Sequence, residues 1–228
     1  STLNLVVRRD SQDDDVEVVR RNIEVPMVTW EQYGDVGYIK IKEFHNNTPA
    51  QFNTALKQLT GNGVKALIFD VRQNSGGNAT NSTQIASRFT NEKILTGYIQ
   101  HKTGPGHHDF SRPYAIYLEP SKNIRWEKKV AVLTNRHSYS ATNDFVKHMK
   151  CLPNVVIVGD KTGGGSGMPF SSELPNGWTV RFSASPHFDR DMNQIEWGIN
   201  PDVKIDMKSE DEVKGIDTII EKARELLK

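Results

Sequence analysis

"KVAVLTNRHSYSATNDFVKHMK", Lys129–Lys150, is the stretch of sequence that decides the fold. Its apolar start, KVAVLT, is typical of a strand buried on both faces, and its end, FVKHMK, predicts a short helix. Two serines, Ser138 and Ser140, lie in the turn between them. A serine hydroxyl here has two interpretations. It caps the helix, or it is a nucleophile beside the unpaired N–H groups of the helix start, which stabilise a developing oxyanion.

A second stretch repeats the order of strand, turn and helix. The run VKALIFDV, residues 64–71, is followed by the turn RQNSGGN and by TNSTQIASRF, which predicts a helix. This order is typical of an α/β fold, in which sites form where loops leave the carboxyl ends of strands. Gly76 and Gly77 allow a bend that aims an N–H group into a cleft. Two such loops commonly supply the two donors of an oxyanion hole.

The remaining elements follow from periodicity and turn residues. The sequence predicts a hairpin over 2–25, a strand over 36–41, a helix from Thr48 to Gly61, strands over 114–118 and 155–159, a hairpin around Pro-Asn-Gly at 175–177 and a C-terminal helix from Ser209 to Leu227. Its apolar stripe contains Val213, Ile216, Ile219, Ile220, Ala223 and Leu227. Residues 101–113 are predicted to form a mobile surface loop.

Composition excludes several classes of function. The 228 residues include 29 Lys plus Arg and 28 Asp plus Glu, so the net charge of +1 argues against a dedicated nucleic-acid binder. The single cysteine, Cys151, excludes an internal disulfide and a cysteine-based zinc site. No His, Asp and Glu cluster has metal-ligand spacing, and no apolar run reaches the length of a membrane span. We therefore predict neither a metal nor a cofactor.

Five motifs occur in the order found in a known peptidase family. They are GYIKIKEF, GVKALIFDVRQNSGG, KVAVLTNRHSYSATNDF, VIVGDKTGGGSG and EWGINPDV. Between about Val36 and Asp206 the chain thus resembles the tail-specific, or C-terminal processing, serine peptidases, a family that includes the tricorn-like peptidases. The opening residues 1–25 resemble the end of that family's PDZ domain with its linker. Residues 26–228 would then be the catalytic domain.

The resemblance implies a fold and a set of site residues. The fold is an α/β core of ββα units similar to crotonase and Clp protease, with a mixed sheet flanked by helices. The activity is that of a serine endopeptidase, which cleaves at or near C-terminal or unstructured segments through an acyl-enzyme. In the family the nucleophile is the middle serine of a small-residue turn. The implied residues are Ser140 as nucleophile, the amides of Gly76 and Ala141 as oxyanion donors, and Gly77, Gly164 and Gly165 as substrate-binding residues.

The chain departs from the family pattern at the general base. Many members use a lysine, and its position here is Gly165, while Lys161 is interpreted as a solvated loop lysine. The tricorn-like branch instead uses a histidine with a glutamate, which places the carboxylate at Glu196. Among the seven histidines, His187 is the best internal candidate for the base. Our hypothesis is that the base comes from a region upstream of this chain. The run GGGSG, 163–167, is predicted to be a flexible rim of the cleft.

Two other classes of function stay open. A catalytically inactive module could bind peptides or apolar ligands on the same fold, and the missing lysine permits this. An acyl-CoA enzyme of crotonase type also pairs two backbone N–H donors, but it would not need Ser140. The peptidase interpretation implies a polypeptide substrate, a partner role for the upstream PDZ region of the same protein and no nucleic acid. The family resemblance also implies an extracytoplasmic location, in the periplasm or at a membrane.

Overall fold

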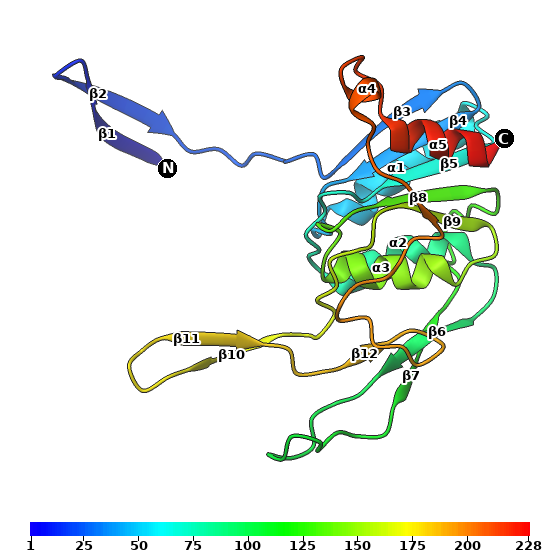
Figure 1. The fold of residues 1–228 in the computed structure, drawn as a ribbon. Coiled ribbons are helices and arrows are strands. Elements are labelled where there is room, and N and C mark those ends of the chain that lie inside the picture. Colours follow the sequence, from blue (N-terminus) through cyan, green and yellow to red (C-terminus); the bar gives the residue numbers. More distant parts are fainter.

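The centre of the molecule is a six-stranded, mostly parallel sheet, seen in a computed structural model that describes all 228 residues. Its strands lie in the order β13-β9-β8-β5-β4-β3 (Figure 1). They are β3 (Val28–Tyr33), β4 (Val36–Ile41), β5 (Ala66–Asp70), β8 (Val130–Thr134), β9 (Val155–Gly159) and β13 (Val203–Lys204). Only the β3–β4 pair is antiparallel. The prediction of an α/β fold with a mixed sheet flanked by helices is confirmed.

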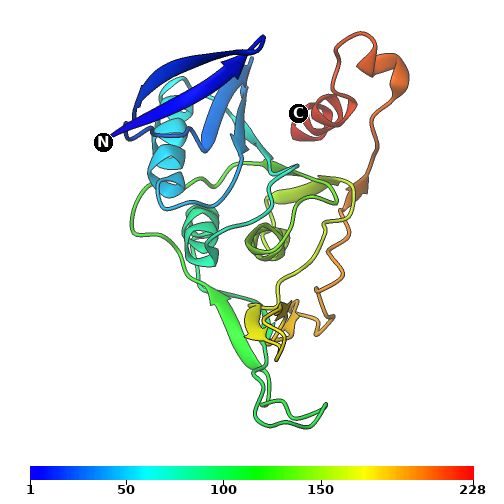
Figure 2. The ribbon, with the colours of Figure 1, turned by 90° about the vertical axis from the view of Figure 1, so that its left-hand side faces the viewer.

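Helices cover both faces of this sheet, and the alternation of side chains along β5 shows why. Leu67 and Phe69 point to one face and pack with the helices α1 (Thr48–Gly61), α2 (Ala79–Ala86) and α3 (Ala141–Lys150). Ala66 and Ile68 point to the other face and pack against α5 (Thr218–Leu227). Figure 2 shows α5, in red, on the other side of the sheet from the helices α1 to α3. Because both faces are buried, the strand is apolar throughout, as its sequence predicted.

Three smaller β-structures extend from this core. The strands β6 (Ile94–Ile99), β7 (Tyr114–Leu118) and β12 (His187–Phe188) form a three-stranded sheet, of which only β7 was predicted. The strands β10 (Phe170–Glu173) and β11 (Thr179–Phe182) form the predicted hairpin around Pro-Asn-Gly. The strands β1 (Thr2–Arg9) and β2 (Gln12–Val19) pair only with each other and project away from the core in Figure 1. No helix has the length and apolar character that a membrane crossing requires.

The prediction of one C-terminal helix from Ser209 to Leu227 is wrong. The chain forms a single turn, α4 (Ser209–Glu212), then breaks at Gly215, whose φ of +70° suits glycine, and restarts as α5. Asp217 begins the second helix because its carboxylate accepts hydrogen bonds from the N–H groups of Ile219 and Ile220, each at 3.0 Å. Val213 was assigned to the apolar stripe but is 89% exposed.

The sheet topology places the two predicted junctions next to each other. The strands β5 and β8 are parallel neighbours, so the turns after their carboxyl ends leave the same edge of the sheet. The turn after β5 contains Gly76 and Gly77, and the turn after β8 contains Ser140. The loop after β9, which contains the GGGSG run, leaves this edge as well. Three consecutive loops therefore meet at one point, as expected for a site in an α/β fold.

Candidate active site

Ser140 begins α3 in a strained backbone conformation and does not cap the helix. Its φ is 57° and its ψ is −123°, a region that non-glycine residues rarely occupy. Its side chain makes no capping hydrogen bond, and its Oγ contacts no polar atom of the protein at hydrogen-bonding distance. The other serine of the turn, Ser138, is fully buried and donates to the carbonyl of Val71 at 2.8 Å. Ser138 is thus structural, and the free hydroxyl belongs to Ser140.

The glycine turn after β5 lies directly against Ser140. A Cβ atom added to Gly76 would sit 2.8 Å from Ser140 Cβ and 3.0 Å from the amide nitrogen of Ala141. The φ of Gly76 is +114°, which also favours glycine. Both observations explain why this position has no side chain. The structure thus places Ser140 beside the diglycine turn. These are the two junctions that the sequence predicts as parts of one site.

The amides of the two turns differ from the prediction in one respect. The N–H of Gly76, assigned as an oxyanion donor, instead donates to Oδ1 of Asn74 at 2.9 Å. The N–H groups of its neighbour Gly77 and of Ala141 make no hydrogen bond within the protein. In this structure the amide of Gly76 is thus occupied. The amides of Gly77, in the same turn, and of Ala141, directly after Ser140, are free.

The GGGSG run connects Ser140 to Glu196 and is not a flexible rim. The N–H of Ser140 donates to the carbonyl of Gly164 at 2.7 Å, and the N–H of Gly165 donates to the carbonyl of Glu196 at 3.0 Å. A Cβ atom on Gly164 would lie 1.8 Å from that same carbonyl oxygen. Main chain packs on main chain here, so the prediction of a flexible rim is wrong. One glycine separates the serine turn from the Glu196 segment.

The position expected for a catalytic lysine is a glycine covered by the ring of Tyr139. A Cβ atom on Gly165 would lie 2.1 Å from Cζ of Tyr139, whose ring covers this glycine. The φ of Gly165 is +76°, which further disfavours a side chain. Lys161 forms no ion pair and no side-chain hydrogen bond that would activate it. A lysine at position 165 would therefore need both a left-handed backbone and a displacement of the exposed Tyr139 ring.

No histidine ring of the chain forms a hydrogen bond or ion pair with Ser140 or the Glu196 carboxylate. The half-buried carboxylate of Glu196 accepts one hydrogen bond, from Ser183 Oγ at 3.2 Å. His187, the internal candidate for the base, is buried, and its Nδ1 lies 3.3 Å from Oδ1 of Asp144 without hydrogen-bond geometry. The structure thus places His187 away from the serine and beside α3.

A buried charged cluster surrounds that histidine. Burial alone would raise the pKa of Asp144, but His187 and the charge of Lys147 outweigh it and hold the pKa below its usual value. Lys147 Nζ lies 3.2 Å from Asp144 Oδ1. Burial, together with the charge of Lys147, lowers the pKa of His148 to about 3, so its ring is neutral and bonds Thr96 Oγ1 at 2.8 Å. These groups connect α3 to β6 and β12.

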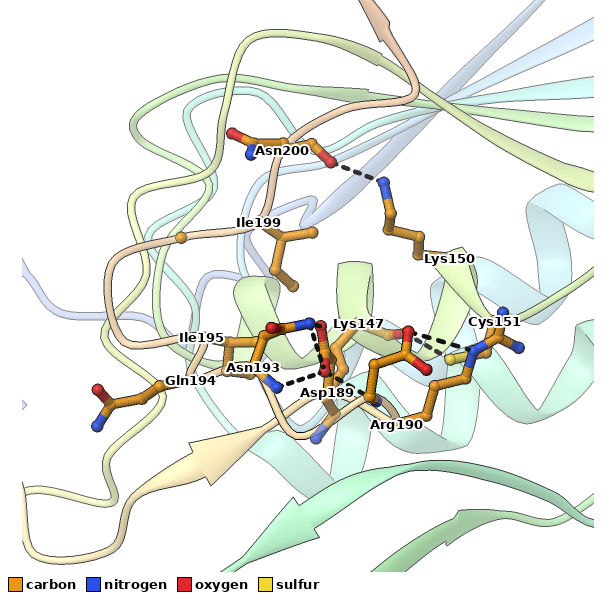
Figure 3. Close-up of a pocket in the computed structure, with 12 residues that line it drawn as sticks. Lys147, Lys150, Cys151, Asp189, Arg190, Asn193, Gln194, Ile195, Ile199 and Asn200 are labelled. Atoms are coloured by element: carbon orange, nitrogen blue, oxygen red, sulfur yellow. Dashed lines mark hydrogen bonds and ion pairs between the residues drawn. The ribbon is translucent and has the colours of Figure 1, made fainter.

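Two cavities flank the Glu196 segment. One, of about 450 Å³, has Glu196 in its wall and is otherwise rich in apolar side chains. These include Phe110, Phe170, Phe182 and Pro186. The other, of about 380 Å³, lies beside the C-terminal half of α3 and is lined by charged and amide side chains (Figure 3). It contains neither Ser140 nor Glu196. The apolar cavity is therefore the one adjacent to a candidate catalytic group.

The sequence analysis missed three residues that hold the site together. Asn74, Thr142 and Asn143 are fully buried polar side chains. Asn143 Nδ2 donates to Ser166 Oγ at 2.8 Å and to the carbonyl of Ile195, next to Glu196, at 3.0 Å. Thr142 Oγ1 donates to Oδ1 of Asn74 at 2.7 Å. In the sequence these residues are typical of turns and helix starts, so only their burial distinguishes them.

Comparison with known proteins shows what this arrangement resembles. The chain is 27% identical over 204 residues to a "Probable CtpA-like serine protease" of Staphylococcus epidermidis, covering 89% of this chain and 40% of that protein. The chain thus spans about 40% of the length of the curated relatives it matches. A crystal structure from Parabacteroides merdae, described as a peptidase, is 50% identical, with a TM-score of 0.83 over 88% of this chain and 64% of that one.

A more distant structure shares the fold. The photosystem II D1 C-terminal processing protease is 20% identical and has a TM-score of 0.65, over 90% of this chain and 56% of its own. The family model of peptidase family S41 matches residues 35–205, which include both glycine runs, the serine turn and Glu196. On this match the chain belongs to peptidase family S41, the C-terminal processing serine peptidases related to tricorn.

Proposed function

We propose that this chain is the catalytic region of a serine endopeptidase and that Ser140 is its nucleophile. The observation that carries the proposal is the unbonded hydroxyl of Ser140, held at a strained backbone position against the Gly76–Gly77 turn. Strain of this kind costs about 1–3 kcal/mol and persists where the surroundings enforce it, commonly at active sites. A serine serving only as a helix cap would adopt relaxed, extended dihedrals and bond the helix amides.

The reaction follows the chemistry of acyl transfer. Ser140 Oγ loses its proton to a base and attacks the carbonyl carbon of the scissile peptide bond. The oxygen that becomes negative accepts hydrogen bonds from the N–H groups of Ala141 and Gly77. The C–N bond breaks as the departing amine takes the proton, which leaves an ester on Ser140. Water, deprotonated by the same base, then hydrolyses the ester and regenerates the hydroxyl.

The base in this proposal is a histidine supplied by a region upstream of residue 1. Support comes from the 228 residues themselves, in which no histidine reaches Ser140 and a lysine at Gly165 would overlap Tyr139. Glu196 would orient that histidine and balance its positive charge during the reaction. The main chain of Glu196 is connected to that of Ser140 by two hydrogen bonds, one from Gly165 to Glu196 and one from Ser140 to Gly164. Residues 1–25 would be the end of a PDZ domain within the same upstream region.

The substrate in this proposal is a polypeptide, cleaved at or near a C-terminal or unstructured segment. An extended chain is required because the site lies at a sheet edge among three loops. The apolar cavity beside Glu196 would accept a large apolar side chain of that substrate. We place the enzyme outside the cytoplasm, where other members of such families commonly work.

The test is covalent labelling with a fluorophosphonate, followed by peptide mapping. Both the 228-residue chain and the full-length protein are treated, because only the latter contains the proposed base. We expect a label on Ser140 in the full-length protein, no label in Ser140→Ala, and slow labelling of the short chain. Ser138→Ala is the matched control: it loses the 2.8 Å bond to Val71 and some stability, but it keeps the label.

One alternative has a specific observation in its favour. A non-catalytic module that binds peptides needs no base, and no base contacts Ser140 within these residues. That module would bind an unstructured peptide equally well in wild type and Ser140→Ala, and Ser140 would remain unlabelled in the full-length protein. A crotonase-type acyl-CoA enzyme predicts activity that survives Ser140→Ala. Specific labelling of Ser140 with peptide cleavage contradicts both alternatives.

A further inference from the structure

Asn74 is a fully buried residue at which three parts of the site meet. Its side-chain Nδ2 donates to the carbonyl of Ile41, at the end of β4, at 3.0 Å. Its Oδ1 accepts from the N–H of Gly76 at 2.9 Å and from Thr142 Oγ1 at 2.7 Å. Its main-chain carbonyl accepts from the N–H of Tyr139 at 3.0 Å. Both side-chain polar atoms of Asn74 are therefore bonded: Nδ2 to the end of β4, and Oδ1 to the two turns that meet at Ser140.

These bonds determine which amides of the two turns are occupied and which are free. Because Asn74 Oδ1 holds the Gly76 N–H, the next peptide group is oriented by the same turn and leaves the Gly77 N–H free. The bond from Thr142 connects this turn to the first turn of α3, whose first residue is Ala141. The two free amides thus belong to segments that share one side-chain oxygen. A shift of either segment would change the distance between the amides.

We propose that Asn74 and Thr142 are positioning residues, which hold the free amides of Gly77 and Ala141 in register with Ser140. This inference rests on the proposed peptidase function, since the register matters to the reaction only if both amides bind the same oxyanion. Preorganised donors act strongly because they need no rearrangement when charge develops. Displacements on the order of 1 Å in such sites cost about 100-fold in rate.

A purely structural role would stabilise the fold and leave the chemistry unchanged. Thr142→Val separates the two possibilities because it removes the hydroxyl and keeps the shape of the side chain. Thr134→Val is the matched control: Thr134 is also fully buried, and its hydroxyl makes one hydrogen bond, to the carbonyl of Asp160 at 2.7 Å. A third variant, Thr142→Ser, keeps a hydroxyl at position 142. Wild type and the three variants are compared as the full-length protein.

We expect the two valine variants to unfold at similarly lowered urea concentrations. Only Thr142→Val should slow the fluorophosphonate labelling of Ser140, by about 10-fold or more, and Thr142→Ser should recover most of the rate. Hydrogen exchange of the Gly76 amide gives a readout that does not need activity. This exchange should become about fivefold faster in Thr142→Val alone, because Asn74 Oδ1, which accepts from the Gly76 N–H, loses its second hydrogen bond, the one from Thr142.

Any of three results would overturn the inference. The first is equal labelling rates in Thr142→Val and Thr134→Val, the second is an unchanged exchange rate of the Gly76 amide in Thr142→Val, and the third concerns Thr142→Ser. Failure of the proposed function gives a different pattern, since wild type itself would then remain unlabelled while the exchange measurement still reports the coupling. Labelling that stays slow in Thr142→Ser would also contradict the role assigned to the hydroxyl.

Discussion

Single glycines decide how closely the elements of the site approach one another. Gly164 lies between the serine turn and the Glu196 segment, and its main chain contacts both. Its φ of +84° is nearly the same as the +83° of Gly177, which lies in the β10–β11 turn with open space around it. The two positions therefore share a backbone conformation and differ in their surroundings. Substitutions at the two positions therefore distinguish the cost of backbone strain, which both share, from the cost of close packing, which only Gly164 has.

We expect Gly164→Ala to destabilise the protein far more than Gly177→Ala. A left-handed alanine costs about 1 kcal/mol at either position. At Gly164 the added Cβ would also lie 1.8 Å from the Glu196 carbonyl, so main chain must move and the total loss should exceed about 3 kcal/mol. Urea denaturation measures both variants. Equal losses in the two variants would show that the serine turn and the Glu196 segment do not pack as described.

At the scale of elements, α3 is an amphipathic helix with an unusually polar buried side. Its neutral, buried His148 packs against β6 and has Lys147, Asp144 and His187 around it. The pKa of His148 lies below that of a histidine in an unfolded chain, which is about 6.5. Between that value and about 3, only the unfolded state takes up the proton. Stability from this residue is therefore complete above pH 6.5 and declines as the pH falls below it.

The contribution of His148 to the free energy of unfolding should fall by about 1.4 kcal/mol between pH 7.5 and pH 5.5, because only the unfolded chain binds a proton at this residue. His148→Gln should remove this part of the pH dependence, whatever its effect on stability at neutral pH. His137→Gln, at an exposed histidine, is the control and should leave the dependence as it is in wild type. Chemical denaturation at the two pH values measures it. A pH dependence that persists in His148→Gln would mean that its ring is charged in the folded protein.

The elements also show how far the sequence alone can predict this structure. The apolar runs of β5 and β8 are buried on both faces, so their pattern predicted them and the turns that follow. The break in the C-terminal helix was missed because the apolar stripe continued through Gly215 and outweighed the cap signal of Asp217. The role of Asn74 was missed as well. An asparagine before two glycines is typical of a turn, and its bonds to Ile41, Tyr139 and Thr142 join segments distant in the chain.

At the scale of the whole molecule, segments distant in the sequence meet at two places. The guanidinium of Arg72, at the end of β5, bonds Asp70 and also Asp217 at the start of α5, with its nearest oxygens at 2.7 and 2.8 Å. Burial alone would lower the pKa of Arg72, but the two carboxylates raise it. The ion pairs fasten the C-terminal helix to the strand whose following turn contains Gly76. The ion pairs thus stabilise the strand end that precedes the glycine turn of the site.

The second meeting place is the apolar cavity beside Glu196, which is built from the loop after β6, the β10–β11 hairpin and the Glu196 segment. Phe170 and Phe182 face each other across the hairpin, with ring centroids 4.2 Å apart, and both line the cavity. Trp178 lies near the turn of the same hairpin and is 71% exposed. The hairpin thus has two phenylalanines that line the cavity and one tryptophan outside it, which allows a direct comparison of Phe182 with Trp178.

If this cavity binds a substrate side chain, Phe182→Ala should change selectivity rather than activity in general. For peptides with a large apolar residue at the cleavage site, kcat/KM should fall by about 10-fold, because the lost contact area is worth about 1–3 kcal/mol. For peptides with alanine at that position it should change by less than about twofold. Trp178→Ala should leave both values near those of wild type. Equal losses for both peptides in Phe182→Ala would assign the phenylalanine to the fold of the hairpin and leave the cavity without a role in specificity.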